Sequence, residues 1–279
     1  MKTCGDCYYS DKGTCSNCKD LPSGATTEIS MNFTCDNWKV RPQRTFALGD
    51  LHGAHKALLQ VFERSGFDKE HDELIVLGDV CDGWTEVRQC FDELLTVKHL
   101  VYILGNHDQW ALEWMKRDAQ PTIWTSQGGK NTMKSYWFDK GQVPKSHIEL
   151  LENAQVWHVD EEYNRLFVHG GINKDLPIEK QKVDVCLWDR ELLQRASKRQ
   201  LHNPMDPNLK ITTFNEIFLG HTTTQMFGNS ILPLHFCELW DIDTGAGWSG
   251  KLTIMDVDTK YYWQSDFVYT LYPDEKGRG

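Results

Sequence analysis

The sequence predicts an α+β fold in which short buried strands alternate with helices. Five apolar runs are each followed, directly or one residue later, by glycine: 45–48, 74–77, 100–104, 165–168 and 217–219. Runs of this length are typical of buried strands that leave a sheet at a tight turn. Helix-like stretches at 54–64 and 85–96 separate the first three runs. This β-α-β alternation predicts right-handed crossovers and largely parallel pairing.

After each predicted strand comes a string that pairs glycine with a side chain able to bind a metal. In chain order the strings are GDLHG (49–53), GDVCDG (78–83), GNHD (105–108), HGG (169–171) and GH (220–221). Ligands bind beyond the carboxyl ends of parallel strands, so we expect the strings to meet at one site. A single string is weak evidence, whereas all five in this order predict a metal-dependent phosphoester hydrolase.

The residue types in these strings suit two divalent cations that share a carboxylate. Carboxylate, imidazole and amide-oxygen ligands fit manganese, iron or zinc. Two cations about 3.5–4 Å apart can clamp an anionic phosphate and lower the pKa of a bridging water. His107 follows Asn106 and is expected to protonate the leaving alkoxide, while Asp82 holds its other ring nitrogen.

The strings resemble the phosphoprotein phosphatase family, within the calcineurin-like metallophosphoesterases. The pattern of that family is GDxHG, GDxxDR, GNHE and two later histidines. Its bacterial and bacteriophage branch, which includes lambda-type serine/threonine phosphatases and diadenosine tetraphosphatase-like enzymes, matches further strings: QGG (127–129), HGGI (169–172), LWDR (187–190), GHT (220–222) and DTGA (243–246). The resemblance covers roughly residues 44–265. It implies a β-sandwich flanked by helices, with the site at one sheet edge.

The resemblance also implies a role for each matching residue. Two metal ions share Asp79, with Asp50, His52 and Asp79 around the first and Asp79, Asn106, His169 and His221 around the second. His107 is the implied general acid, paired with Asp82. Manganese is the expected metal, and iron, zinc or nickel are alternatives.

Two positions depart from the family pattern. Gly83 stands where the family has an arginine that contacts phosphate, and Asp108 replaces a glutamate and is expected to keep a supporting role. Arg190 therefore becomes the best candidate for a bidentate phosphate fork, with Asn106 as a second substrate contact. The structural alternative for Arg190 is a surface salt bridge with Glu191 or another neighbour. Loss of the family arginine bears on the substrate more than on the reaction.

Residues 1–41 predict a small Cys-rich module ahead of a catalytic domain at 42–279. The module contains two CxxC pairs and a fifth cysteine: Cys4, Cys7, Cys15, Cys18 and Cys35. Closely spaced CxxC pairs are typical of a zinc ribbon or knuckle, in which four thiolates hold one structural zinc ion. A segment this short needs a metal to fold. Which four cysteines bind is left open, and disulfides or free thiols are competing interpretations.

Composition limits the partners. The net charge of -10 argues against indiscriminate nucleic-acid binding, although bound metals would add positive charge and keep nucleic acid possible. The sequence starts without an apolar signal segment and has no run of the ~18–20 apolar residues that span a membrane, so we expect a cytoplasmic protein without membrane contact. The partner of the Cys-rich module is not specified. The tryptophan-rich region 109–145 is expected to form a helical cap.

Three functions follow from these observations. The first is a phosphomonoesterase, similar to protein serine/threonine phosphatases, that acts on phosphoprotein or small phosphate esters through in-line attack by metal-activated water. The second is a dinucleoside polyphosphate or polynucleotide phosphohydrolase, which Gly83 in place of arginine favours. The third is a non-catalytic scaffold, which only the missing arginine supports.

Overall fold

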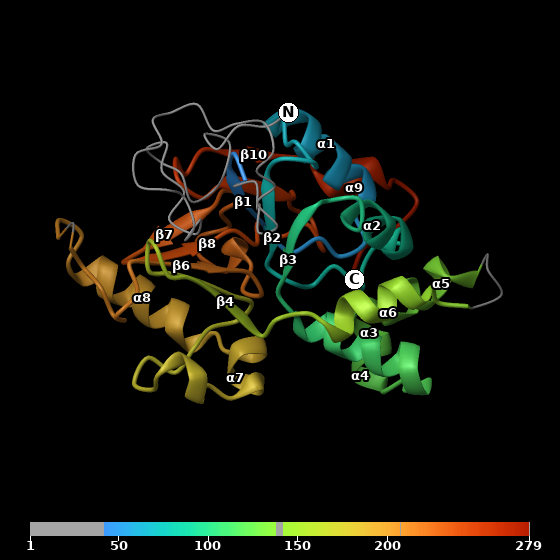
Figure 1. Cartoon of the computed structure of the whole chain (residues 1–279), viewed down its shortest axis with the longest axis horizontal. Coiled ribbons are helices and arrows are strands. Elements are labelled where there is room, and N and C mark those ends of the chain that lie inside the picture. Colours follow the sequence, from blue (N-terminus) through green and yellow to red (C-terminus); the bar gives the residue numbers. More distant parts are fainter. Residues whose placement is uncertain (1–41, 138–141, 207, 279) are drawn as a thin grey trace, which may run out of the picture. The chain divides into compact units, whose positions relative to one another are not determined.

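Two mixed sheets form the centre of the unit Arg44–Gly279 (Figure 1). The computed structural model describes residues 42–137, 142–206 and 208–278. The first sheet has the order β10-β9-β1-β2-β3, with strands β1 (Thr45–Leu48), β2 (Glu73–Val76), β3 (His99–Tyr102), β9 (Thr253–Asp256) and β10 (Tyr262–Gln264). The second has the order β4-β5-β6-β8-β7, with strands β4 (Trp157–Asp160), β5 (Arg165–Val168), β6 (Glu216–Leu219), β7 (Leu234–Phe236) and β8 (Leu239–Asp241).

Each sheet combines three parallel strands with two strands that pair in the antiparallel sense. Strands β1, β2 and β3 are parallel, as are β5, β6 and β8. Strands β9, β10, β4 and β7 pair in the antiparallel sense. All five runs predicted as strands are strands, and the prediction of largely parallel pairing is right for these five strands and for β8 but not for the other four.

The alternation of side chains along the strands shows that the sheets stack face to face. In β1, Phe46 and Leu48 join the core under the helices, whereas Ala47 joins a core that both sheets share. In β5, Phe167 joins this shared core. Its ring stacks on that of Phe218 from β6, with centroids 4.9 Å apart. The α+β sandwich that the resemblance implied is therefore confirmed.

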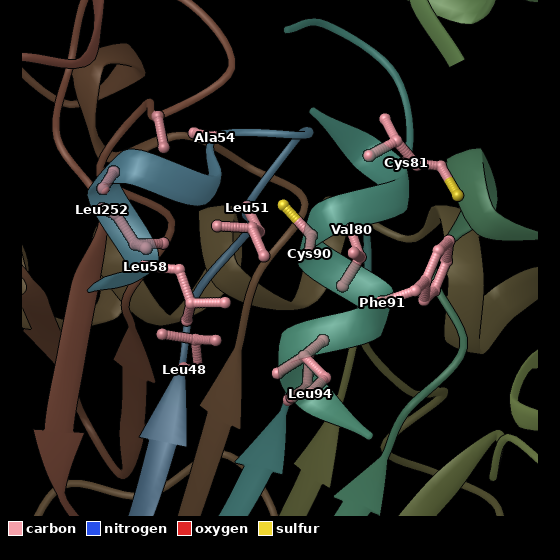
Figure 2. Packing of buried hydrophobic residues seen from close by; sticks show 14 of the residues in the cluster. Leu48, Leu51, Ala54, Leu58, Val80, Cys81, Cys90, Phe91, Leu94 and Leu252 are labelled. Atoms are coloured by element: carbon pink, nitrogen blue, oxygen red, sulfur yellow. The ribbon is translucent and has the colours of Figure 1, made fainter. Parts of the chain in front are cut away.

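Helices cover the outer faces of the sheets. Figure 2 shows Leu58 of α1 and Leu94 of α2 on the side of their helices that faces Leu48 and Leu51. Figure 1 labels the α-helices of the described residues: α1 (His55–Ser65), α2 (Val87–Leu94), α3 (Asn106–Arg117), α4 (Thr122–Trp124), α5 (Lys130–Ser135), α6 (Lys145–Glu152), α7 (Val183–Trp188), α8 (Glu191–His202) and α9 (Val268–Leu271). The predicted helices at 54–64 and 85–96 match α1 and α2 within two residues at each end.

The predicted Cys-rich module lies outside the described residues. Its zinc site at Cys4, Cys7, Cys15, Cys18 and Cys35 and its boundary at residue 41 therefore stay predictions. Among the helices that the structure describes, none combines the length and the apolar character needed to cross a membrane.

The shared core yields a stability prediction. We expect Phe218→Ala to lower the free energy of unfolding by about 3–5 kcal/mol, because it leaves a cavity between two stacked sheets. Leu201→Ala is the control: Leu201 is 74% exposed, so its replacement should cost less than about 0.5 kcal/mol. Urea unfolding measures both values, and equal stability of the two variants would contradict the assigned packing.

Candidate metal centre

The carboxyl ends of six strands meet at one buried site. These strands are the parallel ones of the two sheets, β1, β2, β3, β5, β6 and β8. Each is followed by polar side chains that are at most 6% exposed, namely Asp50, His52, Asp79, Asp82, Asn106, His107, His169, His221 and Asp243. The structure thus brings together all the residues predicted as ligands of the two divalent cations, together with the predicted acid pair.

Glycines in the strings leave room for carboxylates from other strings. A Cβ atom on Gly105 would lie 2.1 Å from Oδ1 of Asp79. A Cβ atom on Gly220 would lie 2.1 Å from Oδ1 of Asp50. Real Cβ atoms do not approach oxygen this closely, so each glycine lets a carboxylate of a different string enter the site.

Four site residues have a left-handed backbone conformation that residues other than glycine rarely adopt. The φ angles are 50° for His52, 50° for Asp79, 68° for Asp82 and 66° for His221. Such conformations cost on the order of 1–3 kcal/mol each and collect at functional sites. The fold holds these four residues in place despite that cost.

The first group of candidate ligands is Asp50, His52 and Asp79, whose ligand atoms all lie within 4.8 Å of one another. Nε2 of His52 lies 3.9 Å from a carboxylate oxygen of each aspartate. Nδ1 of His52 lies 2.9 Å from the carbonyl oxygen of Cys81. A carbonyl only accepts, so Nδ1 carries the proton and leaves Nε2 free to bind a metal.

The second group is Asp79, His169 and His221, also within 4.8 Å. Nδ1 of His169 donates to the carbonyl of Leu77 over 2.7 Å. Its Nε2 faces Oδ1 of Asn106 at 3.0 Å and Oδ1 of Asp79 at 3.4 Å. Nε2 of His221 is buried and has no hydrogen-bond partner within the part of the chain that the structure describes. Both groups contain Asp79, which is the carboxylate predicted to bridge.

The charges at the site also fit cations. Burial raises the pKa of Asp50 well above its usual range, and the neighbouring carboxylates of Asp243 and Asp79 raise it further. Burial opposes ionisation of Asp79 as well, but His169 and other imidazoles hold its pKa well below the usual range. Burial lowers the pKa of His169, yet Asp79 more than offsets this and the pKa is raised. In the metal-free protein a proton on His169 therefore offsets part of the negative charge of the buried carboxylates, which divalent ions would otherwise offset.

The predicted acid pair is formed. Nδ1 of His107 lies 2.6 Å from Oδ2 of Asp82. Trp124 donates its indole N–H to both oxygens of Asp82, and Thr132 donates its hydroxyl to Oδ1 over 2.6 Å. Burial raises the pKa of Asp82, while the hydrogen bond from His107 opposes the shift. The backbone N–H of His107 donates to Oδ1 of Asp79 over 2.9 Å, which fixes the pair beside the shared carboxylate.

Asp108 supports this arrangement from behind. Its Oδ1 accepts the backbone N–H groups of Val80 and Cys81, both over 3.0 Å. Its Oδ2 accepts from the hydroxyl of Tyr102 and the N–H of Gly105. Burial raises the pKa of Asp108 to about 6. The shorter carboxylate thus ties the turn after β2 to the start of α3, which fits the supporting role predicted for it.

Arg190 lies at the rim of the site. Its Nη1 donates to the carbonyl of His221 over 2.9 Å. Burial lowers the pKa of Arg190, and the carboxylates of Asp243 and Asp50 oppose this shift. Glu191 pairs with Arg195 at 2.6 Å, and among the described residues Arg190 forms no ion pair. The guanidinium is therefore available near the candidate ligands.

Two residues of the site were not predicted from the sequence. Asp243 follows β8 as Asp50 follows β1, and its place in the DTGA string was a signal that sequence reasoning left without a role. Arg278 reaches the site from beyond α9, where its Nη2 lies 2.7 Å from Nε2 of His107. No motif surrounds Arg278, so the sequence held no signal for it.

Comparison with known proteins identifies the family. Residues 44–228 match the sequence profile described as calcineurin-like phosphoesterase. The chain belongs to the calcineurin-like phosphoesterase family. It is therefore a hydrolase that acts on phosphoesters, as the strings predicted.

Relatives within this family differ in their substrates. The chain is 26% identical over 239 residues to serine/threonine-protein phosphatase 1 of Salmonella typhimurium, covering 81% of this chain and 96% of the relative. It is 23% identical over 269 residues to the symmetrical bis(5'-nucleosyl)-tetraphosphatase of Pseudomonas fluorescens, and the match covers 77% of this chain and 92% of the relative. A crystal structure of a provisionally assigned diadenosine tetraphosphatase matches with a TM-score of 0.57 and 16% identity. This match covers 80% of this chain and 94% of the other. That last likeness concerns the fold alone.

Calcineurin-like phosphoesterases use divalent metals, and the two candidate groups sharing Asp79 match that requirement. The pKa of His169 then predicts how metal binding depends on pH. A proton and a metal compete for Nε2 of His169, and its pKa is raised above the ordinary value of about 6.5. We expect the affinity for manganese to be higher at about pH 8 than at about pH 6, because fewer His169 rings carry this proton at the higher pH.

Isothermal titration calorimetry of the metal-free protein measures this affinity. His71→Asn is the control, because His71 lies on the surface and its loss should leave the pH dependence unchanged. The same affinity at both pH values would contradict the competition.

Proposed function

We propose that this chain is a metal-dependent phosphomonoesterase similar to protein serine/threonine phosphatases. The observation that carries the proposal is the His107–Asp82 pair, which lies beside the carboxylate shared by the two candidate metal groups. Two divalent ions, when bound, supply charge stabilisation for the phosphate and an activated water. Manganese is the metal we propose.

The residues of the chain then divide the remaining work. Asp82 holds Nδ1 of His107, so Nε2 is the atom that gives a proton to the leaving oxygen. Trp124 and Thr132 orient Asp82 and keep that carboxylate in place during proton transfer. Arg190 at the rim and Asn106 inside the site are proposed to bind the phosphate.

A dinucleoside polyphosphate or nucleotide substrate is the second candidate. Two tryptophans beside the site, Trp110 and Trp188, favour it. Trp188 is 39% exposed and lies edge-on to His221, with centroids 5.9 Å apart. Trp110 packs against both Trp188 and His107, at 5.1 and 5.2 Å. An exposed indole offers a face on which a base can stack. Relative rates on phosphopeptides and dinucleoside polyphosphates distinguish the two candidates.

The acid assignment yields a prediction. We expect His107→Asn to keep its bound metal and to lower the turnover of p-nitrophenyl phosphate with manganese by about 10²–10⁴-fold, because proton transfer to the leaving group is lost. His71→Asn, at an exposed position, should match the unaltered chain. Turnover and metal content are measured on the same samples. Unchanged turnover in a fully metal-loaded His107→Asn variant would defeat the assignment.

A further inference from the structure

Arg278 places a guanidinium between two imidazoles of the site. Its Nη2 lies 2.7 Å from Nε2 of His107 and 3.1 Å from Oε1 of Gln127. Its Nη1 lies 3.3 Å from Nε2 of His52. One neighbour is thus the proposed acid and another is a candidate ligand of the first group. A positive fork at this position faces the space that a phosphate must enter to reach both.

The segment that carries Arg278 is anchored on the residues that follow Gly83. The rings of Tyr272 and Trp84 stack, with centroids 5.1 Å apart and an angle of 23°. The carboxylate of Glu275 accepts from both the backbone N–H and the hydroxyl of Thr85, over 3.0 and 2.7 Å. After α9 the chain returns to the first turn of α3, where Arg278 contacts His107. The contacts with Trp84 and Thr85 hold the segment in a defined place.

The end of the segment is held as well. The backbone N–H of Arg278 donates to the carbonyl of Gly247 over 3.0 Å. The guanidinium carbon lies 4.9 Å from the centroid of the Trp248 ring, so the two side chains form a cation–π interaction. Nε of Arg278 is buried and has no hydrogen-bond partner among the described residues. The Nε–H group of Arg278 is therefore free to donate a hydrogen bond, while both Nη groups contact histidines of the site.

Position 83 explains why the arginine comes from elsewhere in the chain. Gly83 has a φ of 105°, which other residues rarely adopt. A Cβ atom there would lie 2.9 Å from the carbonyl oxygen of His52 and 3.3 Å from Cγ of Arg278. A side chain at 83 and the side chain of Arg278 thus compete for the same space. In the family pattern, position 83 is that of the phosphate-contacting arginine.

We propose that Arg278 is a phosphate-binding residue of this active site and replaces, from a distant part of the chain, the arginine that the family carries at position 83. Its two Nη groups form the fork that engages two phosphate oxygens. Gln127 and Trp248 hold the fork in its plane, and His107 stands next to it to protonate the leaving oxygen. This inference rests on the proposed function.

Arginine variants in the full-length chain test the proposal. We expect Arg278→Ala to lower kcat/KM for p-nitrophenyl phosphate about 10–10²-fold and to weaken binding of inorganic phosphate to the manganese-loaded protein by a similar factor. Arg278→Lys should recover part of both losses, because it restores the charge but not the fork. Added guanidinium ion should partly rescue Arg278→Ala. Arg117→Ala, which removes a surface arginine on α3, is the control.

The possible outcomes separate the two proposals. Normal kcat/KM and normal phosphate affinity in Arg278→Ala would overturn the role of Arg278. Higher activity in that variant would also overturn it, because the segment would then be an inhibitory strap. Absence of manganese-dependent hydrolysis by the unaltered chain would count against the proposed function instead. Phosphate affinity, measured by calorimetry, would still decide whether Arg278 binds the anion.

Discussion

One buried carboxylate, that of Asp79, organises the site. It belongs to both groups of candidate ligands and also accepts the backbone N–H of His107. The same residue therefore sets the distance between the two proposed metal positions and the position of the proposed acid. To hold it there, the chain adopts a left-handed backbone at Asp79 and has glycine at position 105, where any side chain would collide with the carboxylate. Divalent cations, when bound, would offset the remaining cost of burying it beside Asp50.

The surrounding structure fixes the orientation of each ring and carboxylate. Backbone carbonyls of Cys81 and Leu77 hold the tautomers of His52 and His169, so both rings present Nε2 to the site. The shared core between the sheets brings the ends of β1, β2 and β3 next to those of β5, β6 and β8. Ligands that are far apart in the sequence can converge only because this packing aligns two sets of parallel strands.

The sequence predicted five of the six parallel strands and the candidate ligands, because each ligand sits in a short string close behind an apolar run. The stacking of the two sheets was implied by the family resemblance alone. The alternation of side chains along a single strand shows which face is buried, but not whether a helix or a second sheet covers that face. Edge strands such as Tyr262–Gln264 are short and partly polar, so they gave no signal. Trp124 and Thr132 contact Asp82 from 42 and 50 residues away, and Arg278 reaches His107 across 171 residues. Tertiary packing alone creates such contacts.

The central claim is that two metal ions bind on either side of Asp79. Anomalous diffraction at the manganese absorption edge, from crystals grown with manganese, tests it most directly. The account predicts two peaks, one contacting Asp50, His52 and Asp79 and the other contacting Asp79, Asn106, His169 and His221. A single peak that does not touch Asp79, or manganese bound only elsewhere, would contradict it.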